Sequence, residues 1–461
     1  MEFSLRLVFM LLYTPAAMTV SLGRPFWGLL MLVFLYYFRP EIWGAPEWFR
    51  PILWITISVG IGWAVKVRSF RFHPLMGVSL IVLLATLAGA LTANSSTDAA
   101  LDATWVLTKL LIVMFLTMQL VDTPKKINQF LWANVVGMLW NLKTILVVGA
   151  RGGDLERVNV AVGQGGGANY LAWVLVMMLA FLFTRFSSGS KKERTFIFAL
   201  FPLYVLGAVF TGSRGGILQL FAVMTYLVLR SNRKVLGLTA GVLVAAILIV
   251  ALPDAQWARL KRGVGPEEQR DFSAQSRVLL WRAAWTMFRE SPVLGKGIDN
   301  YPLLSPRYAG FFAGKSPRPY EPGATGRGFV AHSTWFQTLA EGGIAVSLPF
   351  FALFPMAFLA MWQTRRLPYD RRLRRRFVDM AVAMEGILIA TIIASTFGSH
   401  MKIDFLWWFF GLFAAIHLTA EDAVVRSQAA RQAEITYRRR NAWRKRAGLD
   451  EVSPQHETVG G

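Results

Sequence analysis

Residues 74–93 read PLMGVSLIVLLATLAGALTA and contain no charged side chain. As a helix, about 20 apolar residues are long enough to cross the ~30 Å hydrocarbon core of a bilayer. Similar runs recur along the whole chain, and we expect about 12 to 13 spanning helices. The fold class predicted is therefore an all-α polytopic membrane bundle. The expected helices cover residues 5–22, 25–38, 51–65, 74–93, 103–121, 129–149, 169–185, 195–210, 214–230, 234–252, 334–361, 378–397 and 403–420.

Composition excludes several protein classes. Hydrophobic residues make up 54% of the 461 residues, and charged residues make up 16%, against roughly 25% in soluble domains. This rules out a water-soluble enzyme, a disordered protein and a secreted disulfide scaffold. The chain has no cysteine and five scattered histidines without an HxxxH or HExxH pair. We therefore expect no protein-encoded metal site and no cofactor.

The formal charge of +22 is explained by topology. Lys and Arg collect in cytoplasmic loops of membrane proteins and set their orientation. If the basic C-terminal tail is cytoplasmic, every second loop is basic, and the N-terminus lies outside. We expect contacts with anionic membrane lipids and no nucleic-acid partner. The basic loops contain Lys66/Arg68/Arg71, Lys125/Lys126, Lys191/Lys192/Arg194, Arg230/Arg233/Lys234 and Arg365–Arg376.

Two outer connections interrupt the series of helices, one at residues 150–168 and a much longer one at 253–333. Long loops are usually functional or disordered, and this one contains an amphipathic run at 273–290 that predicts a helix. The chain divides accordingly into N-terminal helices (1–150), helices 151–252, the large loop (253–333), C-terminal helices (334–420) and a basic tail (421–461).

The helix at 273–290 carries two stripes at 100° per residue. One consists of Arg277, Trp281, Ala284 and Phe288, and the other of Arg282, Trp285 and Arg289. Tryptophan and arginine together suit a helix at a membrane surface.

Several cations are expected at the outer face. A set of arginines at one depth favours a pocket for a dianionic phosphate group, because the guanidinium fork binds two oxygens at once. Lysines inside a span are costly and usually face a cavity or a partner. These candidates are Arg157, Arg214, Arg277, Arg282 and His332, with Lys109 and Lys143 about 9 Å inside their helices.

Each candidate also has a structural interpretation. Arg214 lies in a Gly-rich turn, where an interfacial arginine is common. Lys109 and Lys143 can snorkel outward, and Arg277 and Arg282 can bind headgroups without specificity. His332 precedes Ser333 and Thr334 and can cap a helix. Glu341 lies nine residues after His332, about 180° around that helix, which favours a structural role.

Three motifs together resemble the O-antigen ligase superfamily of bacterial envelope glycosyltransferases, which also includes polymerases and protein O-oligosaccharyltransferases. Thr211–Gly216 (TGSRGG) is similar to the family's S-R-G-G turn. Ser276–Gly297 is similar to its R-x-x-x-W segment followed by P-x-x-G-x-G. Ala331–Ile344 is similar to its H-x-x-x-x-x-x-L-x-E-x-G-x-x-G pattern. A weaker match, Gly165–Ala172, contains Asn169 but has Ala168 where the family often has proline.

The resemblance covers roughly residues 155–350 and implies a metal-independent, inverting transfer of a glycan from undecaprenyl diphosphate to an acceptor hydroxyl. The acceptor would be lipid A core, a protein or another glycan. The enzyme would be a multi-pass protein of the bacterial inner membrane with its site facing the periplasm. Arg214 and Arg282 would neutralise the leaving diphosphate and His332 would act as the base. Donor contacts would come from Arg157, Arg277, Lys109, Lys143, Asn169 and Glu341.

Three other functions fit the sequence less well. A polymerase uses the same donor with a second lipid-linked glycan as acceptor. A transporter for lipid-linked glycans is expected to show internal repeats and broken midplane helices, and neither is evident. A structural membrane protein would leave the outer cations unexplained.

Overall fold

In the computed structural model, residues 5–38, 49–67, 69–93, 95–150, 161–162, 165–230, 272–308 and 328–447 are described, together with scattered positions between 234 and 246. They form an almost entirely helical chain, which confirms the all-α polytopic bundle. The helices are α1 Leu5–Gly23, α2 Pro25–Phe38, α3 Pro51–Lys66, α4 Pro74–Leu91, α5 Thr97–Leu120, α6 Pro124–Ala150, α7 Ala168–Ser188, α8 Lys191–Phe210, α9 Arg214–Arg230, α12 Phe272–Glu290, α13 Tyr301–Tyr308, α14 Thr334–Arg366, α15 Arg371–Phe397 and α16 Asp404–Arg446.

Within these ranges, eight helices are long and apolar enough to cross a bilayer, and α1, α2 and α3 are shorter apolar helices. The eight are α4, α5, α6, α7, α8, α14, α15 and α16. A further helix, α9, matches the expected range 214–230 residue for residue. The helix expected at 234–252 lies largely outside the described residues.

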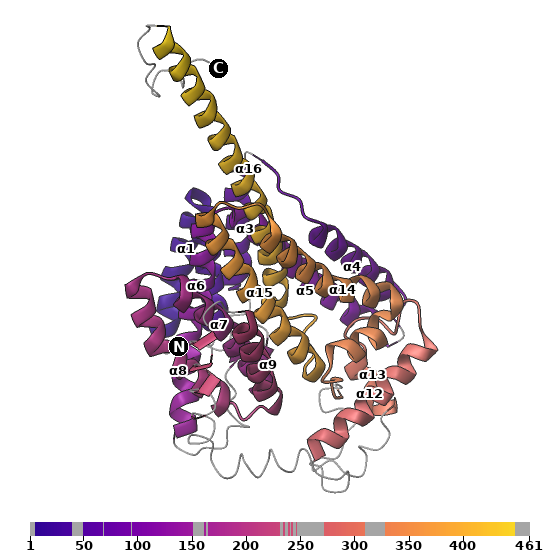
Figure 1. Ribbon diagram of the computed structural model, residues 1–461. Coiled ribbons are helices and arrows are strands. Elements are labelled where there is room, and N and C mark those ends of the chain that lie inside the picture. Colours follow the sequence, from indigo (N-terminus) through magenta and orange to yellow (C-terminus); the bar gives the residue numbers. More distant parts are fainter. Residues whose placement is uncertain are drawn as a thin grey trace.

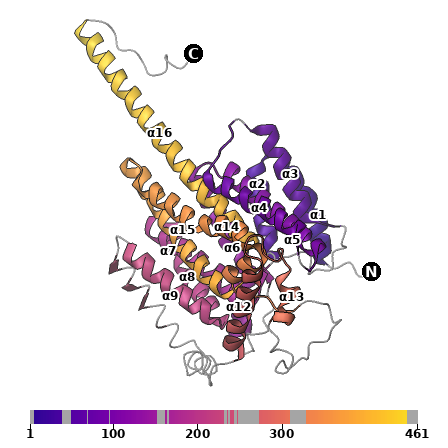
Figure 2. The same ribbon diagram turned by 90° about the vertical axis from the view of Figure 1, so that its right-hand side faces the viewer.

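Helix α7 is enclosed by the helices around it. Every residue from Tyr170 to Thr184 is buried, because α7 packs against α8, α9 and α15 together. Figure 2 shows α7, α8 and α9 at one flank, α1 and α3 at the other, and α14–α16 between them. The outer helices point large apolar side chains outward, such as Leu84 and Phe221, as lipid-facing surfaces require.

The two ends of the bundle differ. The end that we call the tail face carries the C-terminal part of α16, which projects beyond the other helices (Figure 1). There the backbone N–H of Arg71 donates to Gln119 Oε1 at 3.1 Å, and Arg375 donates to the carbonyl of Ser187 at 2.9 Å. The opposite end, the loop face, carries α12 and α13 (Figure 1). Its turns are residues 95–96, 211–213, 291–300, 328–333 and 398–403.

The described basic turns lie at the tail face, as the charge pattern predicts. We expect a cysteine at the exposed Thr286 of α12 to react with a membrane-impermeant maleimide in intact spheroplasts. A cysteine at the exposed Gln428 of α16 should react only after lysis. Both tests use the cysteine-free chain as background. The reverse labelling pattern would mean that the orientation is inverted.

Four features differ from the sequence expectation. Helix α16 continues through Arg446 instead of ending near residue 420. A short helix, α13, follows α12. Helix α14 has a non-helical residue, Gly343, at φ 56°. Finally, β1 (Ala161–Val162) and β2 (Gly165–Gly166) form a two-residue antiparallel pair before α7.

Candidate functional site

The segment after α12 docks on the kink of α14 through backbone hydrogen bonds. The N–H groups of Lys296 and Gly297 donate to the carbonyls of Ala340 and Glu341, both at 2.9 Å. On the other side of the kink, Ile344 N–H donates to Pro292 O at 2.8 Å. A Cβ at Gly295 would lie 2.4 Å from the Glu341 carbonyl. Gly295 of the P-x-x-G-x-G segment is therefore needed for this close backbone approach.

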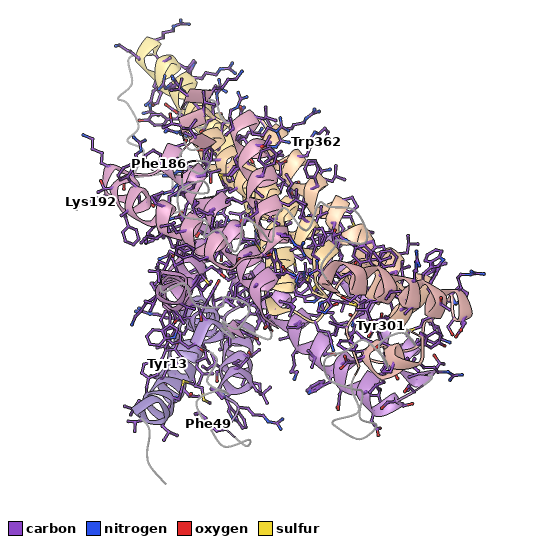
Figure 3. All side chains as sticks on the ribbon, turned by 90° about the horizontal axis from the view of Figure 1, so that it is seen from below. Tyr13, Phe49, Phe186, Lys192, Tyr301 and Trp362 are labelled. Carbon is purple, nitrogen blue, oxygen red and sulfur yellow. The ribbon has the colours of Figure 1, made fainter. Side chains whose placement is uncertain are left out.

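Residues 299 and 300 tie the same segment to two other turns of the loop face. The Asn300 side chain accepts from Ser96 N–H at 2.6 Å and donates to Ser96 O at 3.0 Å. Asp299 pairs with Lys402 at 2.5 Å. The loop is thus fixed to the start of α5 and to the turn between α15 and α16. Figure 3 shows the molecule from below, where Tyr301 lies on the opposite side of the view from Tyr13 and Phe49 of the N-terminal part.

The S-R-G-G turn brings the start of α9 against α7. Ser213 Oγ accepts from Gly216 N–H at 2.9 Å and donates to Asn169 Oδ1 at 2.6 Å. A Cβ at Gly216 would lie 2.4 Å from Ala172 Cβ, and one at Gly215 would lie 3.3 Å from the Phe397 ring. The two glycines therefore let α9 begin in contact with both α7 and α15.

The end of α15, residues 397–398, joins the candidate residues. Asn169 Nδ2 donates to Phe397 O at 3.3 Å, and the Arg277 guanidinium lies 5.8 Å from the centre of the Phe397 ring. Thr334 Oγ1 donates to Gly398 O at 2.7 Å. Sequence reasoning missed residues 397–398, because a Phe-Gly pair at a helix end is common and carries no reactive group.

His332 lies two residues before Thr334 and adopts φ 50°, which is uncommon outside glycine. Its side chain is exposed, although atoms crowd around the ring. Desolvation, and secondarily the charge of Arg277, lower the pKa of His332 below its ordinary value of 6.5. At neutral pH the imidazole is therefore neutral, which is the form that accepts a proton.

The structure thus brings together Asn169, Arg277 and His332 around residues 397–398, which we call the cationic cluster together with Arg214. The backbone of Arg214 is placed in this cluster by its two neighbours. Ser213 hydrogen-bonds to Asn169, and Gly215 lies against the Phe397 ring. The residues of the cationic cluster therefore come from the starts of α7 and α12, the turn before α9 and the residues before α14.

Arg282 is not part of this cluster. It is exposed on the stripe of α12 that includes Trp285 and Arg289, whereas the stripe of Arg277, Trp281 and Ala284 faces α14. Five residues along a helix correspond to a rotation of about 140° away from Arg277. The expectation that Arg282 joins Arg214 at one diphosphate is therefore not supported by its placement.

The two intramembrane lysines lie elsewhere. Lys109 lies 5.9 Å from the ring centre of Trp105, and Lys143 lies 5.8 Å from that of Trp140. Both tryptophans are about half exposed, at 56% and 48%, which agrees with lysines that snorkel along the outer surface. Because α5 begins at Thr97, Lys109 lies twelve residues, or about 18 Å, from its loop-face end instead of about 9 Å.

Of the other candidates, Glu341 is buried and accepts from Tyr301 N–H at 3.2 Å and from Gln337 Nε2 at 3.1 Å. It links the loop to α14 through the hydrogen bond from Tyr301. Arg157 lies outside the described residues. Among the residues that are described, no group of three or more His, Asp or Glu side chains is placed to hold a metal ion.

A second histidine, His400, lies beneath the cluster in the turn before α16. It is buried, stacks on Trp173 with ring centres 4.6 Å apart, and lines a cavity of about 20 Å³ with Glu341 and Gln337. Burial lowers the pKa of His400 to about 3. Nothing in the sequence pattern distinguishes this histidine from the other four.

We expect His400 to make the protein less stable in mild acid. Below pH 6.5 the unfolded chain binds a proton at this histidine that the folded chain does not bind, so stability falls as pH decreases. His400→Phe keeps an aromatic ring against Trp173 and removes the titration. Thermal unfolding in detergent between pH 7 and pH 5 should show a weaker pH dependence in the variant. An unchanged dependence would contradict the burial of a neutral His400.

One comparison with known proteins finds a family that matches part of the chain. Residues 196–351 match a family model described as O-antigen ligase. The matched range begins in α8 and ends in α14, so it contains the S-R-G-G turn, α12 and His332. A comparison with curated proteins finds no match. The family match confirms the resemblance to the O-antigen ligase superfamily and supports a membrane glycosyltransferase of ligase type.

Proposed function

We propose that this protein of the O-antigen ligase type transfers a glycan from undecaprenyl diphosphate to an acceptor hydroxyl. The transfer takes place at the periplasmic face of the bacterial inner membrane. The observation that carries the proposal is the convergence of Asn169, the Ser213–Arg214 turn, Arg277 and Thr334, two residues after His332, on residues 397–398. All lie at the loop face, where a donor with its lipid tail in the bilayer presents its diphosphate.

The cations of the cluster suit the leaving group. As the bond between the anomeric carbon and the diphosphate oxygen breaks, negative charge develops on the diphosphate. Arg214 and Arg277 neutralise this charge without a metal ion. Helices α7, α9 and α14 also begin here, and their N-terminal N–H groups favour an anion.

His332 suits the acceptor. The acceptor hydroxyl attacks the anomeric carbon from the face opposite the diphosphate, its proton passes to the ring nitrogen of His332, and the configuration inverts. The exposed ring is accessible to an acceptor, and its lowered pKa keeps it neutral at periplasmic pH. Arg282 lies on the outer stripe of α12, where it would contact a lipid headgroup or the distal glycan.

The proposal is tested by incubating purified protein with undecaprenyl diphosphate carrying a short glycan and with one acceptor at a time. The acceptors are lipid A core, a Ser/Thr-containing peptide and a second lipid-linked glycan. Mass spectrometry should detect transfer to one of them, and NMR should show an inverted anomeric centre. Transfer to the second lipid-linked glycan alone would make the protein a polymerase. Failure with all three, together with absence of donor binding, would overturn the proposal.

Metal removal should leave the reaction intact, because we assign charge neutralisation to arginines. We expect the rate in excess EDTA to stay within about two-fold of the untreated rate, since no metal contributes to ΔG‡. The measurement is the initial rate of transfer in detergent. Loss of activity that magnesium or manganese restores would mean that a cation, and not the cluster, neutralises the diphosphate.

A further inference from the structure

Ala331, the residue before His332, is held at both of its backbone polar groups. The Ala331 N–H donates to Gln337 Oε1 at 3.2 Å, and the Ala331 carbonyl accepts from Trp281 Nε1 at 3.1 Å. Ala331 is fully buried, whereas His332 is exposed. The next backbone angle is the positive φ of His332. A non-glycine residue keeps such an angle only where its surroundings over-determine it.

The orientation of the Gln337 amide is fixed by its partners on both sides. A backbone N–H only donates hydrogen bonds, so the Gln337 oxygen must face Ala331 N–H, which donates to it at 3.2 Å. The same oxygen accepts from Ser399 Oγ at 2.6 Å. The Gln337 NH₂ group then faces Glu341 and donates to it at 3.1 Å. Glu341 therefore supports the orientation in which the Gln337 oxygen meets Ala331.

Trp281 is fixed in a comparable way from the other side. Its ring stacks on Phe336 with centres 5.2 Å apart and planes 12° apart. The indole N–H is thereby aimed at the Ala331 carbonyl, and the stripe of α12 that carries Arg277 is held at the start of α14. A shift of this contact would move His332 and Arg277 relative to each other.

We infer that Gln337 and Trp281 are positioning residues that hold His332 beside Arg277 by clamping the N–H and the carbonyl of Ala331, with Glu341 supporting the orientation of Gln337. The inference rests on the proposed function for its kinetic consequence, but its geometric part does not. A displacement of about 1 Å at a reacting group can lower a rate by about 10²-fold. Both residues contact the backbone next to His332, and neither is assigned a contact with substrate.

The first test needs no substrate. The pH dependence of His332 carbethoxylation by diethyl pyrocarbonate, followed by mass spectrometry of its peptide, reports its pKa. In Gln337→Ala, His332 should move away from Arg277 and its pKa should rise toward 6.5. Trp281→Phe retains the stacking on Phe336, removes the N–H and should act in the same direction. Gln363→Ala, on an exposed glutamine at the tail-face end of α14, is the matched control and should change nothing. An unshifted His332 pKa in both variants would overturn the inference.

The second test exchanges the two side chains. Gln337→Glu places two carboxylates in contact and should lower kcat about 10- to 100-fold with donor affinity within a few-fold. Adding Glu341→Gln restores one donor and one acceptor at the contact and should recover most of the turnover at an unchanged net charge. A double variant no better than Gln337→Glu would contradict the clamp. Absence of transfer by the wild-type protein would instead count against the proposed function, because the pKa comparison stands without it.

Discussion

Replacing His332 by alanine is expected to lower turnover about 10²- to 10⁴-fold, the usual contribution of a general base, while donor affinity stays within a few-fold. The ring lies at the loop face beside Arg277 and is exposed to an incoming acceptor. Its loss removes the group that takes the acceptor's proton and leaves the arginines that hold the donor. Initial rates at saturating donor, compared with donor affinity from a binding assay, separate the two effects.

The pH dependence of the rate is a second measure of the same role. The pKa of His332 is lowered by desolvation and then by Arg277. The rate should therefore fall to half of its plateau value only below pH 6.5, as the ring becomes protonated. An alternative view is that the histidine only hydrogen-bonds the donor. That view predicts weaker donor binding in His332→Ala and no fall of the wild-type rate at low pH. These two results together would rule out His332 as the general base.

The helices could be predicted well from the sequence because their signal is local. A run of about 20 apolar residues has few alternatives to a spanning helix, and ranges such as 25–38 and 214–230 agree with the structure. The amphipathic helix expected at 273–290 is observed at Phe272–Glu290. Helix α13 was missed, since its eight residues include two prolines and have no apolar stripe.

The site was only partly predictable, because its geometry depends on contacts between distant segments. Resemblance to the family selected Asn169, Arg214, Arg277 and His332, which the structure gathers around residues 397–398. The two stripes of α12 were also evident from spacing, yet the sequence does not say which of them faces α14. This is why Arg282 was grouped with Arg214 and proves to lie on the exposed stripe.

The docking of residues 291–297 on the α14 kink illustrates the same limit. Its glycines are visible in the sequence, but the reason for them is a contact with backbone about 50 residues further along the chain. There Gly343 has φ 56°, and a Cβ on Gly343 would lie 2.4 Å from Val293 O. Glu341 was expected to be structural from its angle on the helix. Its link to Gln337, and through it to His332, follows only from the three-dimensional arrangement.

Arg277 and Arg282 are expected to differ, although they are the same residue type on the same helix. Arg277→Ala should lower transfer roughly 30- to 1000-fold, because losing a charge-assisted contact to a buried anion costs about 2–4 kcal/mol. Arg214→Ala should have an effect of similar size. Arg282→Ala should lose much less, since an exposed arginine on the outer stripe keeps competing contacts with water and headgroups.

Lysine substitutions sharpen this comparison. Arg277→Lys and Arg214→Lys keep the charge but cannot form the two-pronged contact with phosphate oxygens, so we expect them to recover little of the loss. The measurement is kcat/KM for each variant at matched expression and matched thermal stability. Equal losses in Arg277→Ala and Arg282→Ala would place both stripes of α12 on the donor. Full activity in Arg214→Lys and Arg277→Lys would reduce these residues to general positive charges at the membrane boundary, because only a bidentate contact distinguishes the guanidinium from an ammonium group.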